Sequence, residues 1–127
     1  MQNDTLPTSP SKAVHRFEIR PAAAEPDPLG EATLKAARGT LANVAAVHTA
    51  RLYLVEAALD DEQARRVADE LLADPISQRF SLGHNGDQSQ SFGGIEVHFK
   101  PGVMDPVAQS TQAAIREMIP GLDDVTV

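Results

Sequence analysis

Residues 14–28, VHRFEIRPAAAEPDP, contain the pattern that decides the fold: an alternating stretch, a turn and a helix start. Phe17 and Ile19 share one side of an extended chain and charged residues occupy the other, which is the period of a half-buried strand. Asp27 is a favourable N-cap residue and Pro28 suits the first helical position. The stretch therefore predicts a strand followed by a helix that begins at Pro28.

The residues that follow continue this alternation of helix and strand. A long strand is predicted over 44–59, and Asp60 opens a second helix by placing its carboxylate on unpaired backbone N–H groups. Asp74 and Pro75 end that helix, because the residue before proline is pushed out of helical geometry. A short strand over 76–82 completes an α+β sandwich, with one layer of helices on one sheet. The first helix should bury an apolar stripe of Leu29, Ala32, Ala36, Ala37 and Leu41.

The strand–turn–helix pattern occurs a second time near the end of the sequence. When the Asp-Pro pair at 27–28 is placed on the pair at 105–106, the offset is 105 − 27 = 78 residues, and 17–49 aligns with 95–127 without a gap. Apolar positions fall in register even where the residues differ. The sequence therefore predicts an internal repeat.

The second copy is shorter than the first. It should supply a strand over 95–100, a helix capped by Asp105 that begins at Pro106, and the start of a long strand at 124–127. We expect the chain to be the front of a longer polypeptide, or the half copy to pack on the first copy or on another chain. The predicted division is a disordered tail (1–13), a first unit (14–82), a linker (83–94) and half of a second unit (95–127).

Composition excludes several classes of function. Eleven basic against 18 acidic residues give a net charge of −7, and no basic patch offsets it, so we expect no nucleic-acid partner. No apolar run approaches the ~20 residues that cross a bilayer, so no membrane partner is expected. The absence of cysteine fits a reducing compartment. We expect a cytoplasmic protein.

The candidate site residues are structural rather than chemical. Asp27, Asp60 and Asp105 stand at helix starts, where capping explains a carboxylate, and Asp74 with Pro75 stands at a helix end. The four histidines lack metal-ligand spacing. We therefore expect no catalytic, cofactor-binding or metal-binding residue in this segment.

One stretch of the long strand is apolar on both of its faces. A half-solvated sheet needs only one apolar face, so another copy or subunit should cover the second. The interface candidates are Leu52, Tyr53, Leu54 and Val55.

These features together resemble a known family. Residues 95–106, IEVHFKPGVMDP, look like the strand–Lys-x-Gly-Val-x-Asp-Pro opening of PurS, the small subunit of phosphoribosylformylglycinamidine synthase. The first copy has the Asp-Pro-x-Gly-x-Ala part at 27–32, and residues 68–76, ADELLADPI, resemble the family's second-helix ending. The second copy departs at Ala108, where the family usually has glycine. The resemblance covers 14–82 and 94–127 and implies two tandem PurS-like units, the second truncated, each with helices on one face of an antiparallel sheet.

The resemblance also implies a function. The complete enzyme, a ligase that needs ATP and Mg, converts formylglycinamide ribonucleotide to the amidine in purine biosynthesis with nitrogen from glutamine. Its PurS-like part is noncatalytic and holds the glutaminase against the synthase for ammonia transfer. Two tandem copies resemble the N-terminal region of a fused PurL-type large subunit, so the partners would be the glutaminase and synthase components, a fused synthase domain, and the paired PurS-like copies. Whether the synthase activity lies on this chain stays open.

The alternative is a small-molecule-binding regulatory domain of the ACT type, because its strand–helix order is similar. Such domains usually place a glycine-containing loop between the first strand and the first helix. Residues 21–26 contain no glycine.

Overall fold

The computed structural model describes residues 11–84, 94–122 and 124–127, which form a three-stranded sheet and several helices. The strand order is β2-β1-β3, and both pairings are antiparallel. The predicted α+β class is therefore confirmed. In chain order the elements are β1 (Ala13–Pro21), α1 (Pro28–Arg38), β2 (Arg51–Ala57), α2 (Asp61–Arg66), η2 (Val67–Leu72), β3 (Gln78–His84) and α3 (Pro106–Met118).

The register of the sheet sorts its side chains into a buried face and an open face. Phe17 of β1 lies opposite Tyr53 of β2 and Leu82 of β3, and residues directly opposite one another share a face. Phe17 is fully buried and Ile19 nearly so, as the alternation in β1 predicts.

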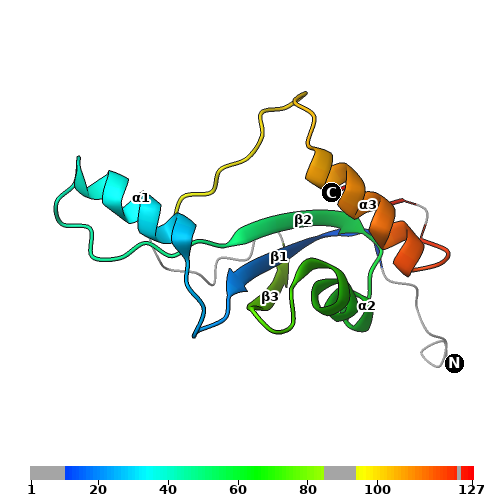
Figure 1. Cartoon of the computed structure of the whole chain (residues 1–127). Coiled ribbons are helices and arrows are strands. Elements are labelled where there is room, and N and C mark those ends of the chain that lie inside the picture. The colour runs from blue at the N-terminus through cyan, green and yellow to red at the C-terminus, as the bar shows by residue number, and fades with distance from the viewer. Residues whose placement is uncertain (1–10, 85–93, 123) are drawn as a thin grey trace, which may run out of the picture.

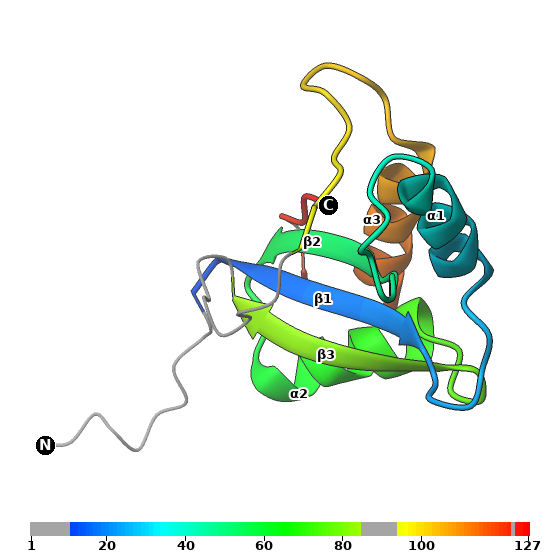
Figure 2. The same ribbon diagram turned by 90° about the vertical axis from the view of Figure 1, so that its left-hand side faces the viewer.

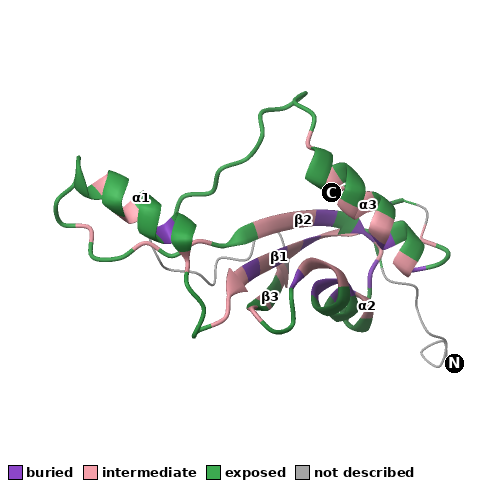
Figure 3. Cartoon of the chain, in the orientation of Figure 1, coloured by how far each residue is buried: buried purple, intermediate pink, exposed green. Residues whose placement is uncertain are grey.

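The core lies between this buried face and the helices α2, η2 and α3. Figure 1 shows α2 on one side of the sheet and the segment 94–104 on the other, and Figure 3 shows buried positions on the strands, α2 and α3. The core residues are Phe17, Val55, Ala57, Leu59, Ala64, Val67, Ala68, Ile115, Ile119 and Val125.

The second helix changes its winding midway. It begins as the α-helix α2 and continues as η2, a π-helix, in which a backbone N–H donates to the carbonyl five residues earlier instead of four. Its end is marked by the Ala73 N–H, which donates to the Ala68 carbonyl at 2.9 Å. Val67 and Ala68, adjacent in sequence, are both fully buried. The wider turn lets two consecutive side chains face the core.

The predicted burial of α1 is wrong. Gly30 is its one buried residue, whereas Leu29 is 66% exposed and Leu41, just beyond the helix, is 58% exposed. Figure 1 shows why: α1 extends past one end of β2, while α3 lies near the other end, and in the view of Figure 2 α1 stands in front of α3. α3 packs against η2 and places Ile115 and Ile119 in the core, so α3 occupies the layer that was predicted for α1.

The strand predicted over 95–100 is also wrong. Residues 94–100 have no regular secondary structure, and Ile95 is 93% and Val97 91% exposed. A strand needs a neighbour for its backbone hydrogen bonds, and no described strand pairs with this segment. At the C-terminus the predicted strand is reduced to one bridge, in which Thr126 and Glu56 exchange hydrogen bonds of 2.7 and 3.0 Å.

The long strand predicted over 44–59 is shorter in the structure. Residues 44–50 run back along α1 instead, because Arg38 donates to the carbonyls of Val44 (3.1 Å) and Ala45 (3.3 Å). The predicted helix over 106–118 is present as α3. The predicted tail and linker fall largely on residues outside the described ranges, so this division stays a prediction.

Candidate interface surfaces

The sheet face away from α2 is the first candidate surface, and we call it the open face. On β1 it carries Arg16, Glu18 and Arg20, which alternate with the buried residues. The register places Leu54 opposite Arg16 and Leu52 opposite Glu18. Both leucines are half-buried, so an apolar strip on β2 runs beside a charged strip on β1.

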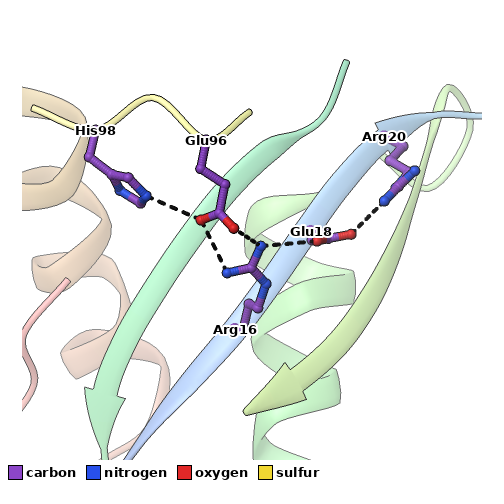
Figure 4. A network of polar contacts seen from close by, with 5 residues as sticks. All are labelled: Arg16, Glu18, Arg20, Glu96 and His98. Atoms are coloured by element: carbon purple, nitrogen blue, oxygen red, sulfur yellow. Dashed lines mark hydrogen bonds and ion pairs between the residues drawn. The ribbon is translucent and has the colours of Figure 1, made fainter. Parts of the chain in front are cut away.

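The charged strip forms a network that reaches a distant part of the chain (Figure 4). Glu18 accepts hydrogen bonds from Arg20 at 2.6 Å and from Arg16 at 3.4 Å. Arg16 also donates to both carboxylate oxygens of Glu96, at 2.7 and 3.3 Å. The His98 ring nitrogen Nε2 lies 3.2 Å from Glu96. Arg16 therefore joins two carboxylates that lie 78 residues apart in the sequence.

The hydrogen bonds of the network shift the pKa values of Glu18, Glu96 and Arg16 so that the charged forms are favoured. The hydrogen bond from Arg20 is the main cause that lowers the pKa of Glu18, and the hydrogen bond from Arg16 is the main cause that lowers the pKa of Glu96. The bond to Glu96 raises the pKa of Arg16 in turn. Both carboxylates are thus ionised at neutral pH, and each is held by a cation. These paired charges hold the segment around Glu96 against β1.

The second candidate surface is the segment 94–104, which lies on the opposite side of the sheet from α2 and contacts the open face through Glu96. Among its residues Ile95, Val97 and Phe99 (61% exposed) place apolar side chains in solvent. The contact of Glu96 with β1 was not predicted from the sequence. The one sequence feature that marks Glu96 is its alignment with Glu18 at the 78-residue offset.

Asp27 is the N-cap of α1 and also binds Thr49, which lies outside the helix. Its carboxylate accepts from the Gly30 N–H at 2.9 Å, from the Thr49 N–H at 2.7 Å and from the Thr49 hydroxyl at 2.6 Å. The bonds from Thr49 are the main causes that lower the pKa of Asp27. Pro28 occupies the first turn of the helix. Asp27 therefore joins α1 to the chain just before β2, a contact with Thr49 that no local pattern signals.

The other predicted caps lie at helix termini. Asp60 and Gln63 form a capping box at α2, in which each side chain accepts from the other's backbone N–H. Asp105 caps α3 by accepting from two N–H groups at 3.1 Å, with Pro106 in the first turn. The carboxylates of Asp27, Asp60 and Asp105 therefore each cap the start of a helix.

Asp74 and Pro75 stand between η2 and β3. The Asp74 carboxylate accepts from the Ile76 N–H at 2.9 Å, and this bond is the main cause that lowers the pKa of Asp74. Its backbone N–H donates to the Gln78 side chain at 2.8 Å. The pair therefore shapes the turn into β3.

The interface candidates of β2 divide between the two faces of the sheet. Val55 is fully buried and Tyr53 packs against the core, so both belong to the inner face. Leu52 and Leu54 lie on the open face. Of the four residues, these two remain candidates for contact with a partner.

Clusters of possible metal ligands and surface hollows are the remaining features of the described residues. No group of three or more His, Asp or Glu side chains among them could hold a metal ion. One surface hollow is lined by charged side chains of α2 and η2 with Phe80 of β3, and another by residues of β1 and β3. Within the described ranges, no helix is long and apolar enough to span a bilayer.

Comparison with known proteins gives structural matches only. No protein-family model and no curated protein matches the sequence. The structure is similar to PurS of B. subtilis, with a TM-score of 0.50 and 16% identity, covering 55% of this chain and 94% of that one. PurS of Methanocaldococcus jannaschii, described as a subunit of formylglycinamide ribonucleotide amidotransferase, gives a TM-score of 0.49 at 17% identity, covering 55% and 92%. Over about half of its length, this chain has the PurS fold.

Proposed function

We propose that this chain is a noncatalytic, structural part of phosphoribosylformylglycinamidine synthase. In this role it docks the glutaminase to the synthase so that ammonia passes between them. The catalytic residues, ATP and Mg would then belong to another domain or subunit of the complex.

One observation carries the proposal. About half of this chain superposes on 94% of B. subtilis PurS, so nearly the whole of a PurS subunit has a counterpart here. The sequence resemblance at 27–32, 68–76 and 95–106 supports the same family. The caps at Asp27, Asp60 and Asp105 serve the fold, which suits a module that positions other proteins.

The open face is the surface that we assign to partner contact. Leu52 and Leu54 supply apolar area, and Arg16 and Arg20 supply charges beside it. Protein interfaces commonly combine an apolar centre with a polar rim. The glutaminase or the synthase would cover this face, and a second PurS-like copy is a further candidate occupant.

Co-purification with the glutaminase and synthase components tests the proposal. The wild-type chain should retain at least one of them, and Leu54→Asp should lose it. Ile76→Asp is the matched control, because Ile76 is 86% exposed in the turn before β3, away from the open face. No association of the wild-type chain with either component would overturn the docking role. A thermal shift caused by free amino acids would favour an ACT-type regulatory role instead.

A further inference from the structure

Arg20 and Arg79 lie directly opposite one another on the central strand β1 and its neighbour β3. Figure 2 shows β1 between β2 and β3, so β3 is at the border of the described sheet. Because opposite residues of an antiparallel pair share a face, both guanidinium groups stand on the open face. Like charges in this position repel one another and weaken the pairing. An anion shared by the two arginines would remove this repulsion.

The carboxylates of the open face balance only part of this positive charge. Arg20 donates to Glu18 at 2.6 Å, and Glu18 also accepts from Arg16 (Figure 4). A guanidinium group has five N–H donors, so Arg20 keeps others for a further acceptor. Among the described residues, no carboxylate forms an ion pair with Arg79, whose side chain is exposed. Arg79 therefore adds a cation to a network in which Arg16 and Arg20 already balance Glu18 and Glu96.

A surface hollow lies beside the two arginines at the border of the sheet. It is lined by Arg20, Arg79, Phe80 and Ser81, and none of these residues is acidic. The hollow between β3 and the helices α2 and η2 is different, because three carboxylates line it together with two arginines. In a chain of net charge −7, a hollow that presents cations without carboxylates favours an anionic occupant.

The pairing of β1 with β3 adds a backbone donor at the same place. The Ala22 N–H donates to the Ser77 carbonyl at 2.8 Å, and in an antiparallel pair such hydrogen-bonded positions recur at every second residue. The two arginines therefore occupy a hydrogen-bonded position. The N–H of Phe80, the next residue along β3, then points away from β1, toward the side of β3 with which no described strand pairs. The Ser81 side chain lies on the open face, two residues after Arg79.

We infer that this hollow, which we call the arginine-pair site (Arg20, Arg79, Phe80 and Ser81), binds the phosphate group of a small phosphate monoester. Such a group carries a charge of about −1.5 to −2 at neutral pH and has three acceptor oxygens. Guanidinium groups bind these oxygens in pairs of parallel hydrogen bonds. The Ser81 hydroxyl and the Phe80 N–H supply donors for the remaining lone pairs. A carboxylate has two oxygens and a single charge, so it would use fewer of these donors.

Glu18 is the acidic residue next to the site, because it lies opposite Ser81 in the register. Its side chain is 15% exposed and is held by Arg20 at 2.6 Å and by Arg16 at 3.4 Å. Two cations therefore balance this carboxylate where it stands, and its repulsion of a bound phosphate is small. The same bonds fix the position of Arg20 beside the hollow.

The arginine-pair site goes beyond the proposed docking role, and its test uses this chain alone. Failure of the co-purification described above would leave the site standing. Failure to bind phosphate would leave the docking role standing.

Titration with inorganic phosphate and with glycerol 3-phosphate tests the site. At constant ionic strength, the backbone amide signals of Phe80 and Ser81 should shift and saturate in the millimolar range in NMR spectra. Arg79→Gln should weaken both affinities about tenfold, because it removes one of the two guanidinium groups. The matched control is Arg65→Gln, which removes the same charge from an exposed arginine of the other hollow and should leave both affinities unchanged.

The outcomes decide the inference because both substitutions are at exposed positions and leave the core intact. Saturable binding of both compounds that Arg79→Gln alone weakens supports it. Shifts that do not saturate overturn it, and so does an equal loss in Arg79→Gln and Arg65→Gln, which would show diffuse attraction by the net charge. Binding of inorganic phosphate without glycerol 3-phosphate would overturn the assignment to a phosphate monoester.

Discussion

Arg16 donates two hydrogen bonds, 2.7 and 3.3 Å long, to the carboxylate of Glu96, which lies 80 residues later in the sequence. This contact joins the central strand to a segment that has no regular structure of its own. Arg16→Ala should therefore loosen residues 94–100 while lowering the free energy of unfolding by less than about 1 kcal/mol, because ion pairs at a surface contribute little. Heteronuclear NOE values of these backbone amides should fall. Arg20→Ala, which removes a partner of Glu18 but not of Glu96, should leave them unchanged, and an equal fall in both variants would contradict this view.

The same contact should respond to acid. Arg16 lowers the pKa of Glu96 below its ordinary value of 4.5, so the contact is complete above that pH and is lost as the pH falls through the lowered value. The NOE values of residues 94–100 should drop in that range. In Glu96→Gln the values should be low already at neutral pH and should lack this acid step. A similar acid step in Glu96→Gln would point to another group.

The two Asp-Pro caps should differ in what they stabilise. Asp105→Ala should lower the free energy of unfolding by about 0.5–2 kcal/mol, because α3 contributes Ile115 and Ile119 to the core. Asp27→Ala should change that value little, because α1 buries only Gly30, but it should speed amide exchange within α1 and at Thr49. Urea denaturation and hydrogen exchange measure the two effects. A larger loss from Asp27→Ala in urea would show that α1 belongs to the cooperative core.

Ile115 and Leu41, which are 74 residues apart, should contribute unequally to the free energy of unfolding. Ile115→Ala should cost about 2–5 kcal/mol, because it opens a cavity in the core. Leu41→Ala should cost less than about 0.5 kcal/mol, because this side chain is mostly exposed. Urea denaturation of both variants tests the difference, and a comparable cost would mean that α1 is covered in solution.

Gly30 lies where α1 and the chain before β2 approach most closely. A Cβ atom at this position would stand 2.6 Å from the Val47 carbonyl oxygen and 2.7 Å from the Asp27 carboxylate. Gly30→Ala should push the returning chain away and raise the exchange rate of the Thr49 amide at least tenfold. Gly39→Ala is the matched control, since a Cβ atom at Gly39 would stand 3.3 Å from the Ala36 carbonyl oxygen. Unchanged exchange in Gly30→Ala would mean that the approach is looser than described.

Patterns that depend on near neighbours in the sequence could be interpreted correctly. The alternation around Phe17 predicts β1, and the Asp-Pro pairs at 27–28 and 105–106 predict the first residues of α1 and α3, because a cap acts within its own turn. The capping box at Asp60 is local in the same sense.

Competition between distant segments could not be predicted. An amphipathic pattern predicts that one side of α1 packs against other residues. It does not predict that α3, with the large side chain of Ile115, packs against the core instead. The alternation at 95–100 is compatible with a strand, but it does not predict whether a neighbouring strand is present to pair with it. Residues 44–50 have strand-forming composition, yet Arg38 and Asp27 bind their backbone along α1.

The π-helical winding of η2 lets the fold tolerate a change in chain length at one point. In an ordinary α-helix each residue is rotated by about 100° from the one before it, and in the six residues of η2 this rotation is smaller. Val67 and Ala68 therefore both face the core. Deleting one residue there would return the stretch to α-helical winding, and Leu71 and Leu72 would keep the core that they now pack against. Comparison of this chain with distant relatives should therefore allow a one-residue gap within η2, where a gap-free alignment would misplace every later position.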